Sequence, residues 1–193
     1  MVGEGRDAFS SRGYEQLDGL IDPRHADHLA RYLILQLENG RLTADASVAD
    51  AAATYGDPVF DVLLDLLAPT IAEVSGAELL PTYSYARLYT AGNELERHRD
   101  RRACEVSVTL TLGGDTPDWP LWIDHPSHGP VAFALAPGSA LLYQGGVQEH
   151  WREPCPGTWH AQLFLHWVRA VGAFADEIFD RRAGLGLPAV NRS

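Results

Sequence analysis

The sequence predicts an α+β fold in which N-terminal helices precede an antiparallel β-sandwich or small β-barrel. Two segments before residue 77 carry helix start and stop signals around apolar residues at helical spacing. From Pro81 onward the pattern changes to an alternation with a period of two, and then to short apolar runs separated by Gly, Pro and Asp. Many short strands after a helical part are typical of this fold class.

The first helix is expected within residues 21–40. Asp22 is a natural N-cap, and Pro23 fits the first helical position because no backbone donor is needed there. Leucines recur four residues apart along the segment, and Asn39 followed by glycine provides the stop signal.

The second helix begins with a repeat of the same signal, Asp57 followed by Pro58, and is expected to end at Gly76. Pro69 is expected to kink or split it, because proline lacks the backbone donor that an interior turn requires. The small and acidic residues between the two helices, 43–56, are expected to form a loop.

Residues 81–89 read as a strand. Tyr83, Tyr85, Arg87 and Tyr89 alternate with smaller residues, which places the four on one face. Further strands are expected at 104–112, 120–123, 131–135, 140–146 and 161–168.

Length and composition predict one domain. The chain has 193 residues, of which 46% are hydrophobic and 21% charged, and this is an ordinary globular composition. We expect a mainly helical part at 15–78, a strand core at 79–170 and a C-terminal extension at 171–193.

The charges exclude several classes of protein. A formal net charge of -11 argues against a nucleic-acid partner, because phosphate backbones are bound mainly by clustered basic residues. All 15 basic residues are arginine. The absence of lysine excludes a P-loop, a Schiff-base enzyme and a protein kinase.

The cysteines and the apolar runs bear on location. Cys104 and Cys155 lie far apart, and the N-terminal residues have no apolar core resembling a signal peptide. No apolar run approaches the roughly 20 residues that span a bilayer. We therefore expect a cytoplasmic protein with reduced thiols and no membrane contact.

The motif His98-Arg99-Asp100 has the clearest chemical meaning. A kinase catalytic loop is excluded, because Glu105 stands where the asparagine of that loop would follow. A structural zinc site would need paired cysteines, and the chain has no Cys-x-x-Cys. The remaining chemical interpretation is a site with two histidines and one carboxylate, which holds Fe(II) and leaves three positions open. On a strand, His98 and Asp100 would project to the same side and reach one metal.

The third ligand has to come from one of the later histidines. His150 is placed best, because it lies just beyond an apolar strand and a Gly-Gly turn, where a later strand can fold back onto His98 and Asp100. His125 and His128 lie in a loop with Pro and Gly, where their positions are less defined.

Three segments carry these residues with a recognisable order and spacing: YARLYTAGNELERHRD, PGSALLYQGGVQEHW and AQLFLHW. Together they resemble the core of the Fe(II)/2-oxoglutarate-dependent oxygenases, nearest to the prolyl-4-hydroxylase-like branch. The resemblance covers roughly residues 79–168. It implies a double-stranded β-helix, which is a jelly-roll core like that of the cupins, buttressed by the two N-terminal helices.

The resemblance also implies roles for single residues. His98 and Asp100 would be the proximal metal ligands and His150 the distal one. Tyr89 matches an upstream tyrosine that hydrogen-bonds the distal carboxylate of 2-oxoglutarate in relatives. Relatives carry an Arg or Lys about ten residues after the distal histidine, and this chain has His160 nearest that place.

The cationic partner of the 2-oxoglutarate carboxylate therefore stays open. His160 can serve if a neighbouring carboxylate raises its pKa and keeps it protonated. Arg87 shares the strand face of Tyr89, and its guanidinium suits a bidentate contact. Arg152 is a third candidate, on the same alternating face as His150.

The implied reaction uses Fe(II), 2-oxoglutarate and O2, yields succinate, and hydroxylates a C–H bond of a small molecule, an amino acid or a peptidyl side chain. Asp100 favours hydroxylation over halogenation, because halogenating relatives have a small residue in its place.

The four arginines at 97, 99, 101 and 102 form either a charged turn or a substrate contact, in which Arg102 would bind an anionic group. Gln162 and His166 share a strand face with His160 and are further candidates for the substrate pocket.

Two other functions are compatible with the same residues. One is a cupin-like protein that binds or senses a metal without turnover. The other is a metal-dependent dioxygenase or isomerase that does not use 2-oxoglutarate. The missing Lys or Arg after His150 motivates the first, and the second shares the ligands but would not require 2-oxoglutarate.

Overall fold

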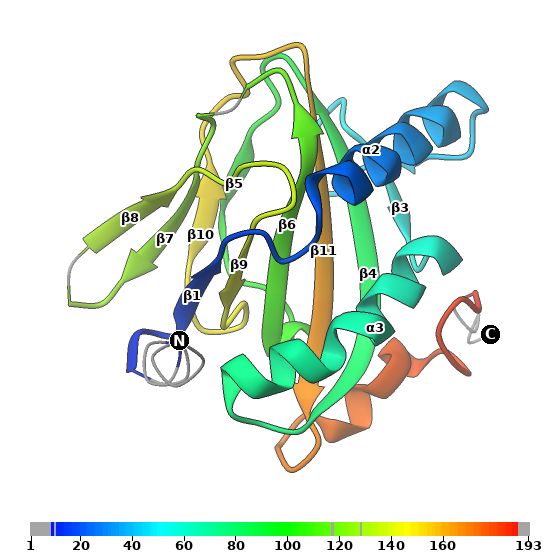
Figure 1. The fold of residues 1–193 in the computed structure, drawn as a ribbon. Coiled ribbons are helices and arrows are strands. Elements are labelled where there is room, and N and C mark those ends of the chain that lie inside the picture. Colours follow the sequence, from blue (N-terminus) through cyan, green and yellow to red (C-terminus); the bar gives the residue numbers. More distant parts are fainter. Residues whose placement is uncertain (1–8, 10, 117, 128, 189–193) are drawn as a thin grey trace.

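The strands form two antiparallel sheets (Figure 1). The computed structural model describes residues 9, 11–116, 118–127 and 129–188. Within these residues, the larger sheet has the strand order β1-β9-β6-β11-β4-β3-β2 and the smaller sheet the order β5-β10-β7-β8. The larger sheet consists of β1 (Tyr14–Leu17), β9 (Ala140–Tyr143), β6 (Val106–Gly114), β11 (Trp159–Arg169), β4 (Leu79–Thr90), β3 (Ala52–Tyr55) and β2 (Thr43–Ala44). The smaller sheet consists of β5 (Leu95–His98), β10 (His150–Arg152), β7 (Leu121–His125) and β8 (Gly129–Phe133).

Both predicted helices are confirmed, with the predicted caps. Helix α2 (Pro23–Glu38) begins after Asp22, whose side chain accepts a hydrogen bond of 2.7 Å from the backbone N–H of Arg24. Helix α3 (Pro58–Ser75) begins after Asp57 in the same way and ends at Gly76, which has a φ of 69°. These caps satisfy backbone groups that lack a partner inside the helix.

Helix α3 continues through Pro69, so the expected split is wrong. Pro69 lies on the exposed side of the helix, and so does Asp65, whose carbonyl loses its hydrogen-bond partner to the proline ring. Because that carbonyl is on the solvent side, water can replace the missing donor.

The loop expected at 43–56 is also wrong in part, because the segment contains β2 and β3. Strand β3 pairs with β4, and Ala53 lies opposite Arg87 in this ladder. Small residues have little preference for strands by themselves. The partner that makes them a strand comes from a distant part of the chain.

The main hydrophobic core lies between the two helices and one face of the larger sheet (Figure 1). Leu33 of α2 and Leu64 of α3 pack in one cluster with Leu163 and Leu165 of β11. Because strand side chains alternate, the other face of β11 is turned toward the smaller sheet. The aliphatic core is therefore on the helical side of the larger sheet.

The inner face of the larger sheet is polar and aromatic. On β11 it carries His160, Gln162, Phe164 and His166, which lie opposite Tyr89, Arg87, Tyr85 and Tyr83 of β4 in that order. The space between the two sheets is thus lined by side chains that can bind a polar ligand.

The chain after β11 packs back onto the fold through η2 (Ala175–Arg181) and the residue that follows it. Arg182 is buried and donates to Asp61 Oδ2 at 2.7 Å and to the carbonyl of Thr82 at 3.0 Å. Residues 189–193 of the expected C-terminal extension lie outside the described residues.

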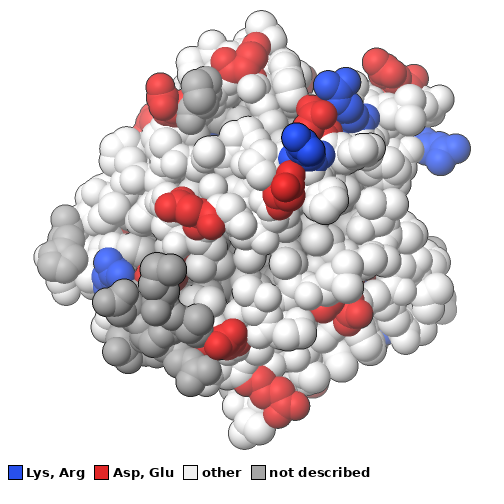
Figure 2. Space-filling view, in the orientation of Figure 1, with Lys and Arg blue, Asp and Glu red and all other residues white. Residues whose placement is uncertain are grey.

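Surface and composition features agree with an acidic chain. In Figure 2 carboxylates are scattered over the helical face, and the arginines of this face lie mainly near α2.

Cys104 and Cys155 are both free and buried. Among the described residues, no helix has the length and apolar character that crossing a membrane requires.

Candidate metal centre

Two imidazoles meet where β5 ends and β10 begins. His98 and His150 lie opposite each other in the β5–β10 ladder, and their ring centroids are 4.3 Å apart. Nδ1 of His98 donates to the carbonyl of Glu96 at 2.7 Å, and Nδ1 of His150 donates to that of Gln148 at 3.0 Å. Because the Nδ1 atoms carry the protons, both Nε2 atoms keep a lone pair for a metal.

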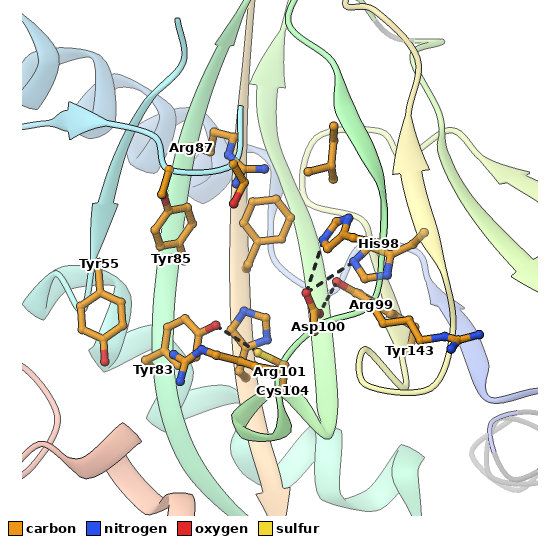
Figure 3. Close-up of a pocket in the computed structure, with 16 residues that line it drawn as sticks. Tyr55, Tyr83, Tyr85, Arg87, His98, Arg99, Asp100, Arg101, Cys104 and Tyr143 are labelled. Atoms are coloured by element: carbon orange, nitrogen blue, oxygen red, sulfur yellow. Dashed lines mark hydrogen bonds and ion pairs between the residues drawn. The ribbon is translucent and has the colours of Figure 1, made fainter. Parts of the chain in front are cut away.

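Asp100 completes the cluster. Its Oδ1 lies 3.6 Å from Nε2 of His98 and 3.6 Å from Nε2 of His150. The three ligand atoms are all within 4.8 Å of one another. Figure 3 shows the carboxylate directed at the two imidazoles. The structure therefore brings together the three residues that the sequence proposed as metal ligands.

The expected reason for this proximity is wrong, because Asp100 is not on a strand. Strand β5 ends at His98, and the chain then turns toward the 3₁₀-helix η1 (Arg102–Cys104). The backbone N–H of Asp100 donates to the carbonyl of Gly145 at 2.9 Å. A contact with the turn after β9, and not the period of a strand, sets the position of the carboxylate.

Gly145 leaves the space that Asp100 occupies. A Cβ added at Gly145 would overlap Oδ2 of Asp100 and would lie 2.8 Å from Oγ of Ser107. At the neighbouring Gly146, an added Cβ would have its nearest contact at 3.8 Å, an ordinary van der Waals distance. The first glycine of the pair is thus required by the cluster, and the second is not.

The charge state of the cluster suits a divalent cation. Burial alone would raise the pKa of Asp100, but the neighbouring imidazoles of His150 and His98 outweigh it and lower the pKa well below its usual range. The carboxylate is therefore ionised at neutral pH. The nearby Asp100 carboxylate in turn raises the pKa of His98, because it stabilises the protonated imidazole. A bound metal would compete for Nε2 of His98 with the proton that charges the imidazole.

A pocket of about 350 Å³ opens onto the cluster. Much of its wall is aromatic (Figure 3), formed by Tyr55, Tyr83, Tyr85, Tyr143 and Phe164. The hydroxyl of Tyr143 is 3.5 Å from Oδ2 of Asp100, and the Tyr143 ring meets His150 edge-on at 4.9 Å. Tyr143 therefore borders two of the three proposed ligands.

A second group of possible ligands consists of Asp100, Cys104 and His166. Burial raises the pKa of the Cys104 thiol, whose sulfur lies 3.0 Å from the hydroxyl of Tyr83. Burial also lowers the pKa of His166 to about 4. Because a metal is bound by the thiolate and not by the thiol, this group is a poorer site than the two imidazoles with Asp100.

Arg87 lines the pocket, but its charge is already paired. Its Nε and Nη2 donate to the two carboxylate oxygens of Asp45 at 2.5 and 3.2 Å. Both side chains are buried, with 7% of Arg87 and 0% of Asp45 exposed. Nη1 of Arg87 donates to the hydroxyl of Tyr89 at 2.8 Å. Asp45 was not expected from the sequence, because it lies in the stretch interpreted as a loop and nothing in its local pattern distinguishes it.

His160 does not have the charge that a carboxylate partner needs. Burial lowers its pKa to about 3, so the ring is neutral at pH 7. Its Nε2 bonds to Oε1 of Gln162 at 2.9 Å, and Nε2 of Gln162 donates to Thr109 Oγ1 at 2.6 Å. His160 and Gln162 thus form a buried polar chain away from the pocket wall, whereas His166 lies in that wall.

Arg152 is buried on the inner side of β10. Its Nη1 donates to the carbonyl of Trp119 at 2.7 Å, and its guanidinium lies 4.6 Å from the centroid of the Trp119 ring. Its Nε has no hydrogen-bond partner.

The four arginines around His98 all lie beside carboxylates. Arg97 pairs with Glu149 at 2.7 Å and also with Asp124. Arg99 is 3.5 Å from Glu149, Arg101 binds both oxygens of Asp180, and Arg102 binds Glu177 at 2.6 Å. Arg99 and Arg101 line the pocket over the metal ligands, while Arg102 lines an adjoining hollow with Glu177 and Asp180.

Comparison with known proteins identifies the fold. No family model and no curated protein matches the chain. A prolyl-4-hydroxylase from Pseudomonas putida aligns with 18% identity over 88% of this chain and 99% of its own, with a TM-score of 0.71. An oxidoreductase of the 2OG-Fe(II) oxygenase family from Burkholderia pseudomallei aligns with 18% identity over 90% and 93%, with a TM-score of 0.70.

The epimerase SnoN of nogalamycin biosynthesis, in complex with Fe3+, alpha-ketoglutarate and nogalamycin RO, aligns with 12% identity over 100% and 94%, with a TM-score of 0.76. At these identities the similarity establishes the fold. The chain has the double-stranded β-helix of the 2-oxoglutarate oxygenases, and the predicted fold class is confirmed.

Proposed function

We propose that the protein is an Fe(II)- and 2-oxoglutarate-dependent oxygenase that hydroxylates a C–H bond and converts 2-oxoglutarate to succinate. One observation carries the proposal. His98, Asp100 and His150 converge on one point beside a pocket, inside a fold that is shared with proteins described as 2OG-Fe(II) oxygenases.

The donor set fits Fe(II). Two imidazole nitrogens and one carboxylate oxygen are the ligands of the facial triad, which leaves three positions of an octahedron for other ligands. When bound, Fe(II) would supply the activation of O2, with the 2-oxo acid as the reductant. The protein would orient the ligands, because both histidines are held by backbone carbonyls and Asp100 is held by Gly145.

Tyr89 is a candidate for a contact with the 2-oxo acid, whereas the guanidinium of Arg87 is already bound by Asp45. The Tyr89 hydroxyl accepts a hydrogen bond from Arg87, so its own proton is free to be donated to a carboxylate. The aromatic walls of the pocket would limit the access of water to the reacting atoms.

The substrate would be a small molecule, an amino acid or a peptidyl side chain. A pocket of about 350 Å³ admits a group of this size. Tyr83 and Tyr85 offer ring faces, and Arg101 offers a cation over the ring of Tyr83 at 4.4 Å. Asp100 occupies the carboxylate position of the triad, which favours hydroxylation over halogenation. We keep the predictions of a cytoplasmic protein without a nucleic-acid partner.

Anaerobic spectroscopy tests the proposal. Addition of Fe(II) and 2-oxoglutarate to the protein should produce the visible charge-transfer band of the chelate. Admission of O2 should then form succinate. His150→Ala should remove both signals, and His28→Ala, which changes an exposed histidine of α2, should leave both intact. A folded, iron-loaded protein without the band would contradict the proposal.

A second candidate function is a cupin-like protein that binds or senses a metal without turnover. The neutral His160 favours it, because this position lacks the cation that relatives use for 2-oxoglutarate. Steady release of succinate excludes such a binder. Consumption of O2 with an organic substrate but without 2-oxoglutarate would indicate a dioxygenase of another kind.

A further inference from the structure

Arg152 is a buried cation for which the described residues provide no anion. Only 1% of the residue is exposed, and no carboxylate of the described chain lies within 4.0 Å of its guanidinium. Its protein partners are a carbonyl and the face of Trp119, and its Nε has none. A guanidinium stays protonated inside a protein, so this charge is desolvated without an anionic partner.

Two other buried arginines show what the fold normally provides. Arg87 has both oxygens of the buried Asp45, and Arg182 has the buried Asp61 at 2.7 Å, with side-chain exposures of 0% and 1%. Arg152 is the exception within the described residues. An anion bound beside Arg152 would give it the kind of partner that Arg87 and Arg182 already have.

The position of Arg152 relative to the metal ligands suggests what that anion is. His150 and Arg152 share the inner face of β10, while Trp151 between them is turned the other way and stacks on Trp122. Residues two apart on a strand are separated by about 7 Å. This is about the length of a five-carbon dicarboxylic acid. A ligand that chelates a metal at His150 with one end can therefore present its other end to Arg152.

The surroundings of Arg152 belong to the same interior. Trp119, which Arg152 covers, meets Tyr89 edge-on at 4.9 Å and His160 edge-on at 5.1 Å. Tyr89 carries the hydroxyl whose proton is free for a carboxylate. A guanidinium from β10 and a phenol from β4 thus approach the interior from the two sheets.

The other two candidates are already committed to partners. A ligand carboxylate at Arg87 would have to displace Asp45, which also accepts a hydrogen bond of 2.7 Å from the hydroxyl of Tyr85. His160 uses its Nε2 on Gln162.

We propose that Arg152 binds the distal carboxylate of a dicarboxylic 2-oxo acid that is chelated at His98, Asp100 and His150. The inference rests on the proposed function and deepens it. It places the cation that binds the distal carboxylate on β10, beside the metal ligand His150, and not on β11, where His160 lies. Selectivity for a dicarboxylic over a monocarboxylic 2-oxo acid then depends on Arg152.

Ligand binding without turnover tests the assignment. The anaerobic Fe(II) protein is titrated with 2-oxoglutarate and with 2-oxopentanoate, which has the same chain length and no distal carboxylate, and the visible band is followed. The wild-type protein should prefer 2-oxoglutarate by about 10- to 100-fold, the value of a charge-assisted pair of hydrogen bonds. Arg152→Met and Arg152→Gln should bind both acids with the same weak affinity.

The matched control is the double variant Arg87→Met with Asp45→Asn, which removes the other arginine of the interior together with its partner. This variant should keep the preference for 2-oxoglutarate. A lost preference here, together with a preserved preference in Arg152→Met, would assign the anchor to Arg87 and overturn the proposal.

Thermal unfolding of the metal-free proteins gives an independent readout. Arg152→Met should be at least as stable as the wild type, because it removes an unpaired buried charge. Succinate should raise the melting temperature of the wild type and not that of Arg152→Met. If both Arg152 variants were less stable than the wild type, Arg152 would be a structural residue and the assignment would fail.

The two levels of inference fail in different ways. If the iron-loaded wild-type protein binds neither 2-oxo acid, the proposed function and the anchor are both wrong. If the wild type prefers 2-oxoglutarate and Arg152→Met keeps that preference, the proposed function stands and only the anchor is wrong.

Discussion

His98 and His150 occupy opposed positions in the β5–β10 ladder, with their ring centroids 4.3 Å apart. Both strands are short, β5 with four residues and β10 with three. A metal held by these two residues and by Asp100 would tie two strands of the smaller sheet to the turn that follows β5. Metal binding and the stability of the smaller sheet should therefore be coupled.

Metal binding should raise the melting temperature. A divalent cation that binds only the folded protein stabilises it by about 2.7 kcal/mol at a free concentration 100 times its dissociation constant. Differential scanning fluorimetry with Mn(II) should show this shift for the wild type and for His28→Ala, but not for His150→Ala. An equal shift in all three proteins would place the metal elsewhere.

Replacement of Gly145 by alanine should weaken the metal site. The added methyl group overlaps the carboxylate of Asp100, which has to move away from the imidazoles. We expect a loss of at least about tenfold in metal affinity, the range seen when residues that orient metal ligands are changed. Gly146→Ala is the matched control, because its Cβ has room. Calorimetric titration with Mn(II) measures both, and equal affinities would show that Asp100 tolerates the displacement.

The metal-free protein should lose stability in mild acid through His160. The pKa of His160 in the folded protein is about 3, below its ordinary value of 6.5. Between these values the unfolded chain takes up a proton that the folded protein refuses, so stability falls as pH falls from about 6.5 toward 3. The slope is roughly 1 kcal/mol per pH unit for this group. Above pH 6.5 His160 contributes no pH dependence.

Urea unfolding of the wild type and His160→Gln at pH 7 and pH 5 measures this contribution. The stability difference between the two pH values should be smaller in the variant. An unchanged difference would mean that His160 is protonated in the folded protein.

Asp61→Asn should destabilise the fold strongly. Asp61 is the partner of the fully buried Arg182 and also accepts hydrogen bonds from Ser84 and Gly186. Removal of one member of a buried ion pair leaves the other charge uncompensated and costs about 3–5 kcal/mol. Asp65→Asn, on the exposed side of the same helix, should change the free energy of unfolding by less than about 0.5 kcal/mol. Equal effects would show that the Asp61 pair contributes no more than a surface charge.

Local sequence patterns were sufficient to predict the helices α2 and α3 and the strand β4. Asp22 and Asp57 cap α2 and α3 through contacts with residues two positions away, so a short stretch of sequence determines them. The alternation in β4 is equally local, because the period of a strand decides which side chains share a face. His150 could be named because it follows an apolar strand and a Gly-Gly turn, and His98 because it stands in the motif His98-Arg99-Asp100.

Contacts between distant residues decided the rest. Asp100 lies beside the two histidines as expected, but its position comes from the carbonyl and the missing side chain of Gly145, 45 positions further along the chain. Strands β2 and β3 exist because β4 offers them an edge. No local pattern contains either contact.

The ligand contacts of the interior depended most on the tertiary structure. The sequence by itself determined that Arg87, Arg152 and His160 face the same side of their strands as other site residues. Only the folded structure decided that Arg87 is neutralised by Asp45, that His160 is neutral and that Arg152 has no carboxylate partner among the described residues. The physical reason is that the charge and availability of a buried group depend on burial and on its neighbours in space, and these come from parts of the chain far apart in sequence.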